Sequence, residues 1–352
     1  MKMRFIMLLC LLLVAGAAGA AIYRTTASGG VALQETNQDA VRSTGLVDPI
    51  DKRLASGFTP DGDTLLAAPP ADAAKLRDPQ RIVFAHLDSD DPDSRDAAGV
   101  DWSAVEKDLS KAVGRPVVDL TYDSSPQQLS AVREGRITLV ALHAADTPFL
   151  VNQYGFHPVA VLGDPGKGAS GNRLDLIVPA TSAIQDPAGI RGHTLTCTLP
   201  SSITGYRAGI ALLMANQQLR PDVDYLINWS LKQKASITGV AGGEYEAACV
   251  SDDKLQSMLD KGQVKSSEYR TIYQSDVFPR TTIGYFYDLK PEIAAKVTTA
   301  LLAYAPADAS DFHLLPVDYK KDFALVREID ARFDPRLDSK IKAHAAGPTT
   351  AP

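Results

Sequence analysis

Three hydroxyl side chains and a glycine stand close together after a predicted strand at residues 194–199. Ser201, Ser202 and Thr204 precede Gly205 and open a predicted helix. The first turn of a helix offers free N–H groups and a positive dipole end, and hydroxyls add hydrogen-bond donors without adding charge. Gly205 allows close approach to the backbone. The pattern predicts an oxyanion site, although a helix cap at Ser201 or Ser202 would alone explain one hydroxyl.

Signatures of catalysis and of cofactor binding are missing. The sequence has no H-E-x-x-H and no G-x-S-x-G, and its six histidines show no metal-ligand spacing. Residues 166–171 match G-x-G-x-x-G, but a predicted strand follows them where a dinucleotide site needs a helix. We therefore expect a binding protein without catalysis, cofactor or metal.

The composition is that of a globular protein with a substantial core. The chain has 352 residues, of which 45% are hydrophobic and 22% charged, and this length suits two domains or lobes. Lys and Arg number 36 against 42 Asp and Glu, which gives a net charge of −6 without a long basic run. Nucleic acid is therefore not an expected partner, and an anion must be held by local groups.

The N-terminus predicts export. Lys2 and Arg4 precede an uncharged run at residues 5–23, so residues 1–22 form a signal peptide or an uncleaved membrane anchor. We expect a periplasmic protein, either soluble after cleavage near Ala20 or tethered to the inner membrane. No cysteine stands at the cleavage point, which argues against a lipoprotein.

Two segments outside the expected core are poor in apolar residues. Residues 23–80 are rich in Ala, Gly, Ser, Asp and Pro, and residues 336–352 are similar. Such segments bury too little apolar surface to offset the entropy of the chain. We expect a flexible tether before residue 81 and a disordered tail after residue 335.

Between these ends, short apolar runs alternate with amphipathic stretches, which predicts parallel sheets covered by helices in an α/β fold. The predicted strands are 81–85, 116–120, 137–142, 157–162, 174–178, 194–199, 225–229, 246–250 and 283–287. The predicted helices are 102–113, 125–135, 203–217, 252–261 and 291–304.

Several segments, in order, resemble the PhnD-like phosphonate, phosphate and phosphite substrate-binding proteins of ABC importers. Residues 200–206 are similar to the family's S-T-[ST]-G-[YF] loop, and residues 243–248 to its G-x-Y-D-A-A strand. Weaker similarities lie at residues 133–140, 182–192 and 289–293. The sequence also departs from the family, because Ile203 replaces a loop hydroxyl and Leu142-His143 replace a Tyr-Gly corner.

The resemblance implies a type II periplasmic-binding-protein fold with a hinge and a ligand cleft between two lobes. Lobe 1 would comprise residues 81–173 and 277–335, and lobe 2 residues 174–276. The implied ligand-binding residues are Ser201, Ser202, Thr204 and Gly205 from lobe 2, and Asp88, Ser89, Tyr122, Ser124, Ser125 and His143 from lobe 1. For Asp88 and His143 the alternatives are a solvated carboxylate and a side chain that only fills the cleft wall.

The implied function is capture of a small oxyanion, such as phosphate, phosphite or phosphonate, for an ABC permease and ATPase. A monomer is expected. The alternative is a membrane-anchored sensory or scaffolding ectodomain with the same fold, which the long tether favours because a diffusing binding protein needs no spacer.

Two cysteines fall in the expected core of lobe 2. Cys10 lies in the targeting segment, whereas Cys197 and Cys249 lie on strands that the implied fold makes neighbours. Exported proteins meet an oxidising environment, so these two residues are a disulfide candidate. The alternative is a pair of buried reduced thiols.

Overall fold

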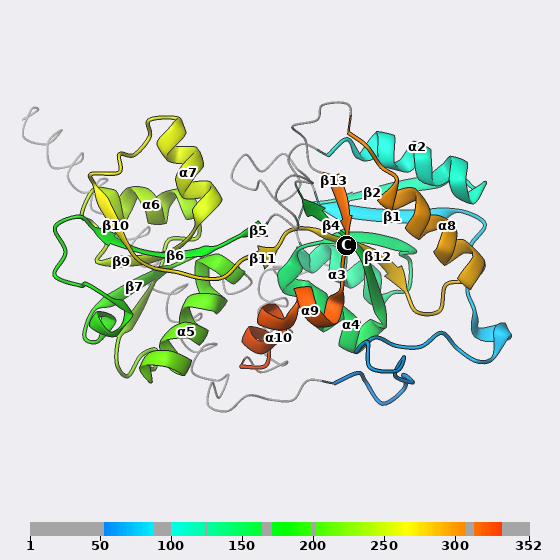
Figure 1. Cartoon of the computed structure of the whole chain (residues 1–352), viewed down its shortest axis with the longest axis horizontal. Coiled ribbons are helices and arrows are strands. Elements are labelled where there is room, and N and C mark those ends of the chain that lie inside the picture. The colour runs from blue at the N-terminus through cyan, green and yellow to red at the C-terminus, as the bar shows by residue number, and fades with distance from the viewer. Residues whose placement is uncertain are drawn as a thin grey trace, which may run out of the picture.

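The computed structural model describes residues 53–87, 100–123, 125–163, 171–198, 202–306 and 313–332. These residues form a six-stranded, a five-stranded and a two-stranded sheet (Figure 1). No helix within these ranges is long and apolar enough to cross a membrane. The predicted signal peptide or anchor, residues 23–52 and the tail from residue 336 lie outside the described residues.

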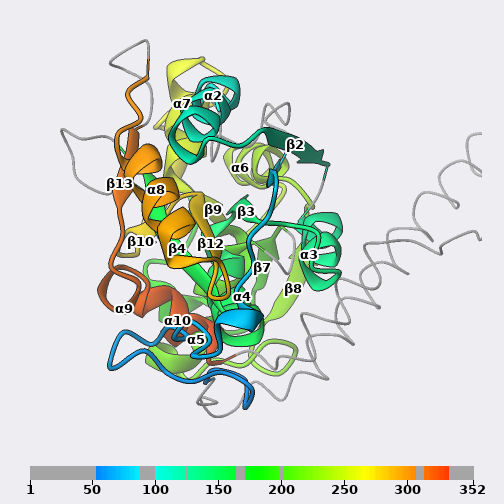
Figure 2. The ribbon, with the colours of Figure 1, turned by 90° about the vertical axis from the view of Figure 1, so that its right-hand side faces the viewer.

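The six-stranded sheet has the order β13-β4-β12-β3-β1-β2, with β1 parallel to both β2 and β3 and with β12 antiparallel to β3 and β4. Its strands are β1 (Ile82–Leu87), β2 (Val117–Tyr122), β3 (Leu139–Leu142), β4 (Phe156–Gly163), β12 (Thr282–Phe286) and β13 (His313–Pro316). Helices α2 (Trp102–Val113) and α8 (Pro291–Leu302) cover one face, and α3 (Ser125–Arg133) and α4 (Thr147–Tyr154) the other (Figure 2). We call this sheet and its helices the first lobe.

The five-stranded sheet has the order β10-β6-β9-β7-β8, with β7 parallel to β8 and β9. Its strands are β6 (Leu174–Pro179), β7 (Thr194–Cys197), β8 (Leu226–Trp229), β9 (Ala247–Ser251) and β10 (Tyr269–Gln274). Helices α6 (Gln233–Ala241) and α7 (Asp252–Asp260) pack on one face, where Ile177 and Val250 point. Helix α5 (Ala208–Gln217) packs on the other face against Leu176 and Cys249, as the alternation of side chains along a strand requires. This is the second lobe.

Two chain crossings join the lobes and pair with each other. The first contains β5 (Gly171–Asn172) and the second β11 (Phe278–Pro279), and these short strands are antiparallel partners. A Cβ at Gly171 would lie 1.8 Å from the Phe278 carbonyl oxygen, so only glycine permits this approach. Next to them, the Leu174 N–H donates to Ser275 Oγ at 2.9 Å. The hinge is thus a hydrogen-bonded ribbon.

Residues 53–80 pack against the first lobe. His157 Nε2 lies 2.6 Å from the carbonyl oxygen of Ala67, and Arg77 Nε donates to Asp288 Oδ1 at 2.8 Å. Three apolar side chains of this segment lie in or against the core: Leu54, Leu66 and Ala67. The prediction of a flexible tether is therefore wrong for residues 53–80. Isolated apolar residues and backbone hydrogen bonds hold this segment, and neither leaves a periodic pattern in the sequence.

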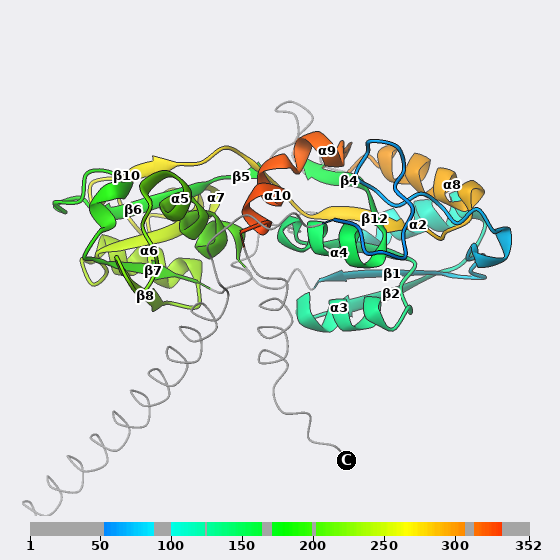
Figure 3. The same cartoon turned by 90° about the horizontal axis from the view of Figure 1, so that it is seen from below.

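The last described helices reach from the first lobe toward the second. Tyr319 begins α9 (Tyr319–Asp322) and Phe323 directly follows it, and both are buried in the core. Helix α10 (Ala324–Asp330) follows and lies close to α5 of the second lobe (Figure 3). Shorter 3-10 helices occur at Ala73–Lys75, Ala144–Asp146 and Pro187–Ile190.

Candidate functional site

The predicted anion loop lies at the carboxyl end of β7, where a helix begins. Residues Ile203–Arg207 form a π-helical turn that continues directly into α5. Ser202 caps this helix, because its Oγ accepts a hydrogen bond from the Gly205 N–H at 3.0 Å. Because a π-helical turn is wider than an α-helical one, its first backbone hydrogen bond runs from the Arg207 N–H to the Ser202 carbonyl oxygen. The Gly205 N–H, in the first turn, is thus satisfied by the Ser202 side chain and not by a carbonyl of the helix.

Gly205 is surrounded by polar side chains. A Cβ at this position would lie 2.0 Å from Thr198 Oγ1, 2.8 Å from Ser202 Oγ and 3.0 Å from Gln233 Nε2. Thr198 is 3% exposed, and its hydroxyl oxygen has no hydrogen-bond partner among the described residues. The loop thus gathers hydroxyl and amide groups closely around one glycine.

Gln233 is a site residue that the sequence did not indicate. It is the first residue of α6, its Nε2 donates to Thr204 Oγ1 at 3.4 Å, and its Oε1 accepts from the Ser251 N–H at 3.0 Å. One side chain therefore fixes the Thr204 hydroxyl against the end of β9. No local motif marks Gln233, because its partners come from two other segments of the chain.

A polar chain continues from Gln233 to the hinge. Ser251 Oγ donates to Asp253 Oδ1 at 2.5 Å, and Arg280 Nη1 donates to Asp253 Oδ2 at 3.0 Å. Arg280 follows β11 in the second crossing and is 8% exposed. The structure thereby links Thr204 in the loop, through Gln233, Ser251 and Asp253, to an arginine of the hinge.

The described first-lobe candidates lie at the carboxyl ends of parallel strands. Tyr122 ends β2, His143 follows β3, and Ser125 opens α3 and donates a hydrogen bond to the buried Asp146 carboxylate. Strands β1 and β2 end on the side that faces the second lobe (Figure 3), the edge at which open α/β sheets bind ligands. The remaining candidates lie outside the described residues: Asp88, Ser89, Ser124 and Ser201.

The two core cysteines lie side by side. Strands β7 and β9 are parallel neighbours, as predicted, and pair Thr196 with Ala248, which puts Cys197 beside Cys249. Both are fully buried free thiols, so the candidate disulfide is not formed in this structure. Burial and the adjacent Cys249 thiol raise the pKa of Cys197.

A carboxyl group with an unusual pKa lies between two strands of the second-lobe sheet. Asp175 on β6 accepts a hydrogen bond from Gln274 Nε2 on β10 at 2.9 Å. Burial raises the pKa of Asp175 to about 6, with a smaller contribution from Asp252, while Gln274 and Arg173 act in the opposite direction. This carboxyl group therefore titrates within the range of ordinary environmental pH.

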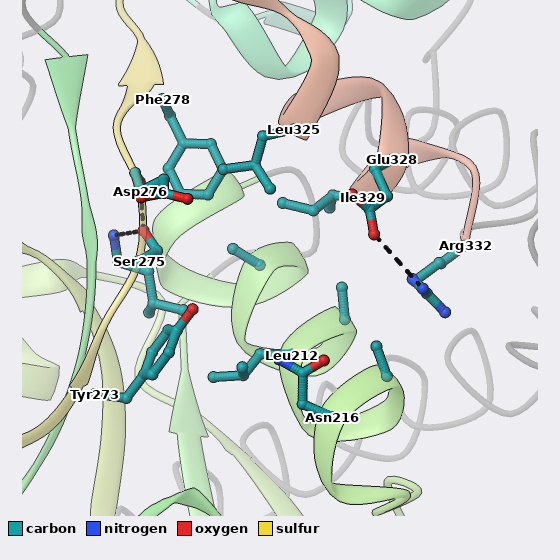
Figure 4. A pocket seen from close by; sticks show the side chains of 14 residues that line it. Leu212, Asn216, Tyr273, Ser275, Asp276, Phe278, Leu325, Glu328, Ile329 and Arg332 are labelled. Carbon is teal, nitrogen blue, oxygen red and sulfur yellow. Dashed lines mark hydrogen bonds and ion pairs between the residues drawn. The ribbon is translucent and has the colours of Figure 1, made fainter.

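A cavity of about 110 Å³ separates α5 from α10 beside the hinge. Tyr273, Ser275 and Asp276 line one wall, and Glu328 and Arg332 line the other (Figure 4). Its lining includes none of the anion-loop side chains that the structure describes. It is a second region of contact between the lobes, distinct from the loop.

Comparison with solved structures defines the fold. XAC2383 from Xanthomonas citri, solved bound to ATP, is 16% identical, with a TM-score of 0.58 over 74% of this chain and 99% of that chain. The binding protein component of an ABC phosphonate transporter from Pseudomonas aeruginosa is 15% identical, with a TM-score of 0.51 over 76% of this chain and 95% of that chain. The predicted type II periplasmic-binding-protein fold is thereby confirmed.

The family follows from the sequence. Residues 92–326 match the family described as ABC transporter, phosphonate, periplasmic substrate-binding protein. The match covers well over half of the chain, which belongs to this family and is an extracytoplasmic solute-binding protein. A comparison with curated protein sequences finds no match.

Proposed function

We propose that this protein captures phosphate, phosphite or a phosphonate between its two lobes and presents it to the permease and ATPase of an ABC importer. Membership of the family carries the solute-binding role. The nature of the ligand and the place where it binds are the proposal.

The observation that supports an oxyanion is the helix start at Ser202–Gly205. The Thr204 hydroxyl, the capping Ser202 and first-turn N–H groups cluster there, beside the amide of Gln233. Such neutral donors form charge-assisted hydrogen bonds with an anion without placing a full positive charge in the site. Release is then easier than from an arginine or lysine clamp.

The first lobe would complete the site. Tyr122 and His143 stand at strand ends of that lobe and Ser125 at the start of α3. Asp88, Ser89 and Ser124 remain first-lobe candidates from the sequence, and Ser201 remains one for the second lobe. Hinge closure of the kind known for periplasmic binding proteins would bring the two groups onto one ligand. The paired strands β5 and β11 are where such a motion would bend.

Calorimetry with phosphate, phosphite and methylphosphonate tests this assignment. The double variant Ser202→Ala/Thr204→Val should lose about 1 to 3 kcal/mol of binding free energy for each hydrogen bond removed. Thr238→Val is a matched control, because Thr238 Oγ1 bonds only to carbonyl groups of its own helix α6 among the described residues. Equal affinity in the double variant and the wild type would overturn the loop assignment, and no binding of any of the three ligands would overturn the ligand class.

The alternative of an anchored sensory or scaffolding ectodomain loses part of its support. It was favoured by a spacer extending to residue 80, whereas residues 53–80 pack on the first lobe. Import is therefore the function we propose.

A further inference from the structure

Three side chains that bind metals well converge on the first lobe, apart from the anion loop. They are His86 on β1, Glu106 on α2 and Asp119 on β2, and one ligand atom from each lies within 4.8 Å of the other two. The spacing of the six histidines predicted no metal site, and these three residues are far apart in the chain. The pairing of β1 with β2 and the packing of α2 bring them together.

A neutral His86 ring cannot donate a hydrogen bond to both of its neighbours. Its Nδ1 lies 3.1 Å from the Leu87 carbonyl oxygen, and its Nε2 lies 2.8 Å from Asp119 Oδ1. Both neighbours only accept hydrogen bonds, whereas a neutral imidazole has a single N–H. Either a second proton or a metal ion at Nε2 must satisfy the ring. An Nδ1–H directed at a backbone carbonyl is the arrangement that orients Nε2 as a metal ligand.

The charge of the cluster favours a divalent ion over a proton. A proton on His86 balances Asp119, but Glu106 adds a second carboxylate to the same small volume. A divalent cation would compensate both carboxylates at once, and Asp119, with 41% of its side chain exposed, leaves a path for the ion to enter.

The ligands stand on rigid elements. The His86 ring is stacked on Trp102, with ring centroids 5.3 Å apart and planes inclined by 22°. Trp102 begins α2, which Asp101 caps by accepting from the Ala104 N–H. A site on paired strands and a capped helix needs little rearrangement to bind an ion.

We propose that His86, Glu106 and Asp119 bind one divalent transition-metal ion such as zinc. One imidazole nitrogen and two carboxylate oxygens leave a coordination position for water, a donor set that suits Zn²⁺. The ion would tie β1, β2 and α2 together directly before Asp88, where the chain leaves β1.

Titration of the full-length protein in phosphate-free buffer, after chelation and desalting, tests the site. Calorimetry with Zn²⁺ should show one ion per chain, and Co²⁺ should give the visible absorption of a low-symmetry site. Glu106→Gln, which keeps the size of the side chain, should weaken Zn²⁺ binding at least about tenfold. His86→Ala should abolish it.

A second histidine–carboxylate pair, in the second lobe, supplies the control. His193 Nδ1 lies 3.0 Å from Glu246 Oε1, but no second carboxylate joins them in a metal-ligating group. His193→Ala should therefore leave Zn²⁺ binding unchanged. Equal binding by the wild type and Glu106→Gln, or loss of binding in His193→Ala, would overturn the proposal and leave His86 and Asp119 as a simple ion pair. Because no oxyanion is used, this outcome is independent of the proposed transport function.

Discussion

Two buried arginine–aspartate pairs tie the second lobe to segments outside it, and they differ in what else they touch. Arg207, at the end of the anion-loop turn, lies 3.6 Å from Asp330 on α10, and both side chains are at most 5% exposed. Arg280, in the hinge, lies 3.0 Å from Asp253, whose side chain is 18% exposed.

The difference lies in their connections. Asp253 also accepts from Ser251 and so belongs to the polar chain that ends at Thr204. The Arg207–Asp330 pair lies beneath the loop helix, near the cavity between α5 and α10. We therefore expect the Arg207–Asp330 pair to stabilise mainly the contact between α5 and α10. The Arg280–Asp253 pair should also position the loop that we propose to bind the ligand.

The largest effect should come from breaking the more deeply buried pair. Asp330→Ala leaves Arg207 without this carboxylate in a buried environment, and such losses cost about 3 to 5 kcal/mol. Urea unfolding monitored by circular dichroism measures the change. Glu328→Ala on the same helix is the control, because its contact with Arg332 is exposed and should be worth less than about 0.5 kcal/mol. Equal losses in the two variants would contradict the role of the buried pair.

Breaking the hinge pair should lower both the stability and the ligand affinity. Asp253→Asn removes the charge that faces Arg280 and weakens the bond with Ser251, which should cost about 2 kcal/mol of unfolding free energy. Through Ser251 and Gln233 it should also lower anion affinity about fivefold, the size expected within one hydrogen-bond network. Unfolding and calorimetry on the same samples compare the two effects, and unchanged affinity would remove the link between hinge and loop.

A third aspartate, Asp175, is buried and accepts a hydrogen bond from the neutral amide of Gln274. Because the pKa of Asp175 is about 6 when folded and 3.8 as the reference, folding takes up a proton between these values. Stability relative to Asp175→Asn should therefore fall as the pH rises from about 4 to about 6, by about 2 kcal/mol in total. Asp108→Asn, at an exposed position, controls for general charge effects. Parallel pH profiles for the wild type and Asp175→Asn would contradict the raised pKa.

The smallest effect is expected for the two buried cysteines, Cys197 and Cys249. Because the pKa of Cys197 is raised and both cysteines are fully buried, neither thiol should react with iodoacetamide in the folded protein. Both should react after unfolding without reductant. Mass spectrometry distinguishes this result from a disulfide, which would block alkylation in both states.

Apolar patterns in the sequence correctly predicted strands and helices that pack one face against a core. The apolar runs at 174–178 and 246–250 are strands β6 and β9, and the helix expected at 252–261 is α7. Helices α4 and α6 were missed. Gly239 interrupts the pattern of α6, yet glycine is needed there because a Cβ would lie 2.3 Å from the Tyr245 ring.

The candidate site was predictable only where it is contiguous in sequence. Ser202, Thr204 and Gly205 belong to one turn, so their types and spacing already indicate a helix start. Gln233 and Arg280 join that turn from α6 and from the hinge, and a contact of this kind depends on the register of strands. The same limit applies to the group of His86, Glu106 and Asp119.

The strand order also has a consequence for the order of folding. The five strands of the second lobe come from one continuous stretch, whereas β12 joins β3 and β4 only after the whole second lobe has been made. Closing such a long loop costs chain entropy. Once the second lobe has formed, Leu174 and Ser275 are hydrogen-bonded to each other. The folded second lobe then bridges most of the chain between β4 and β12, so only short segments remain to be ordered when these two strands pair. We therefore expect formation of the second lobe to accelerate completion of the first, so that the discontinuous lobe is the later one to fold.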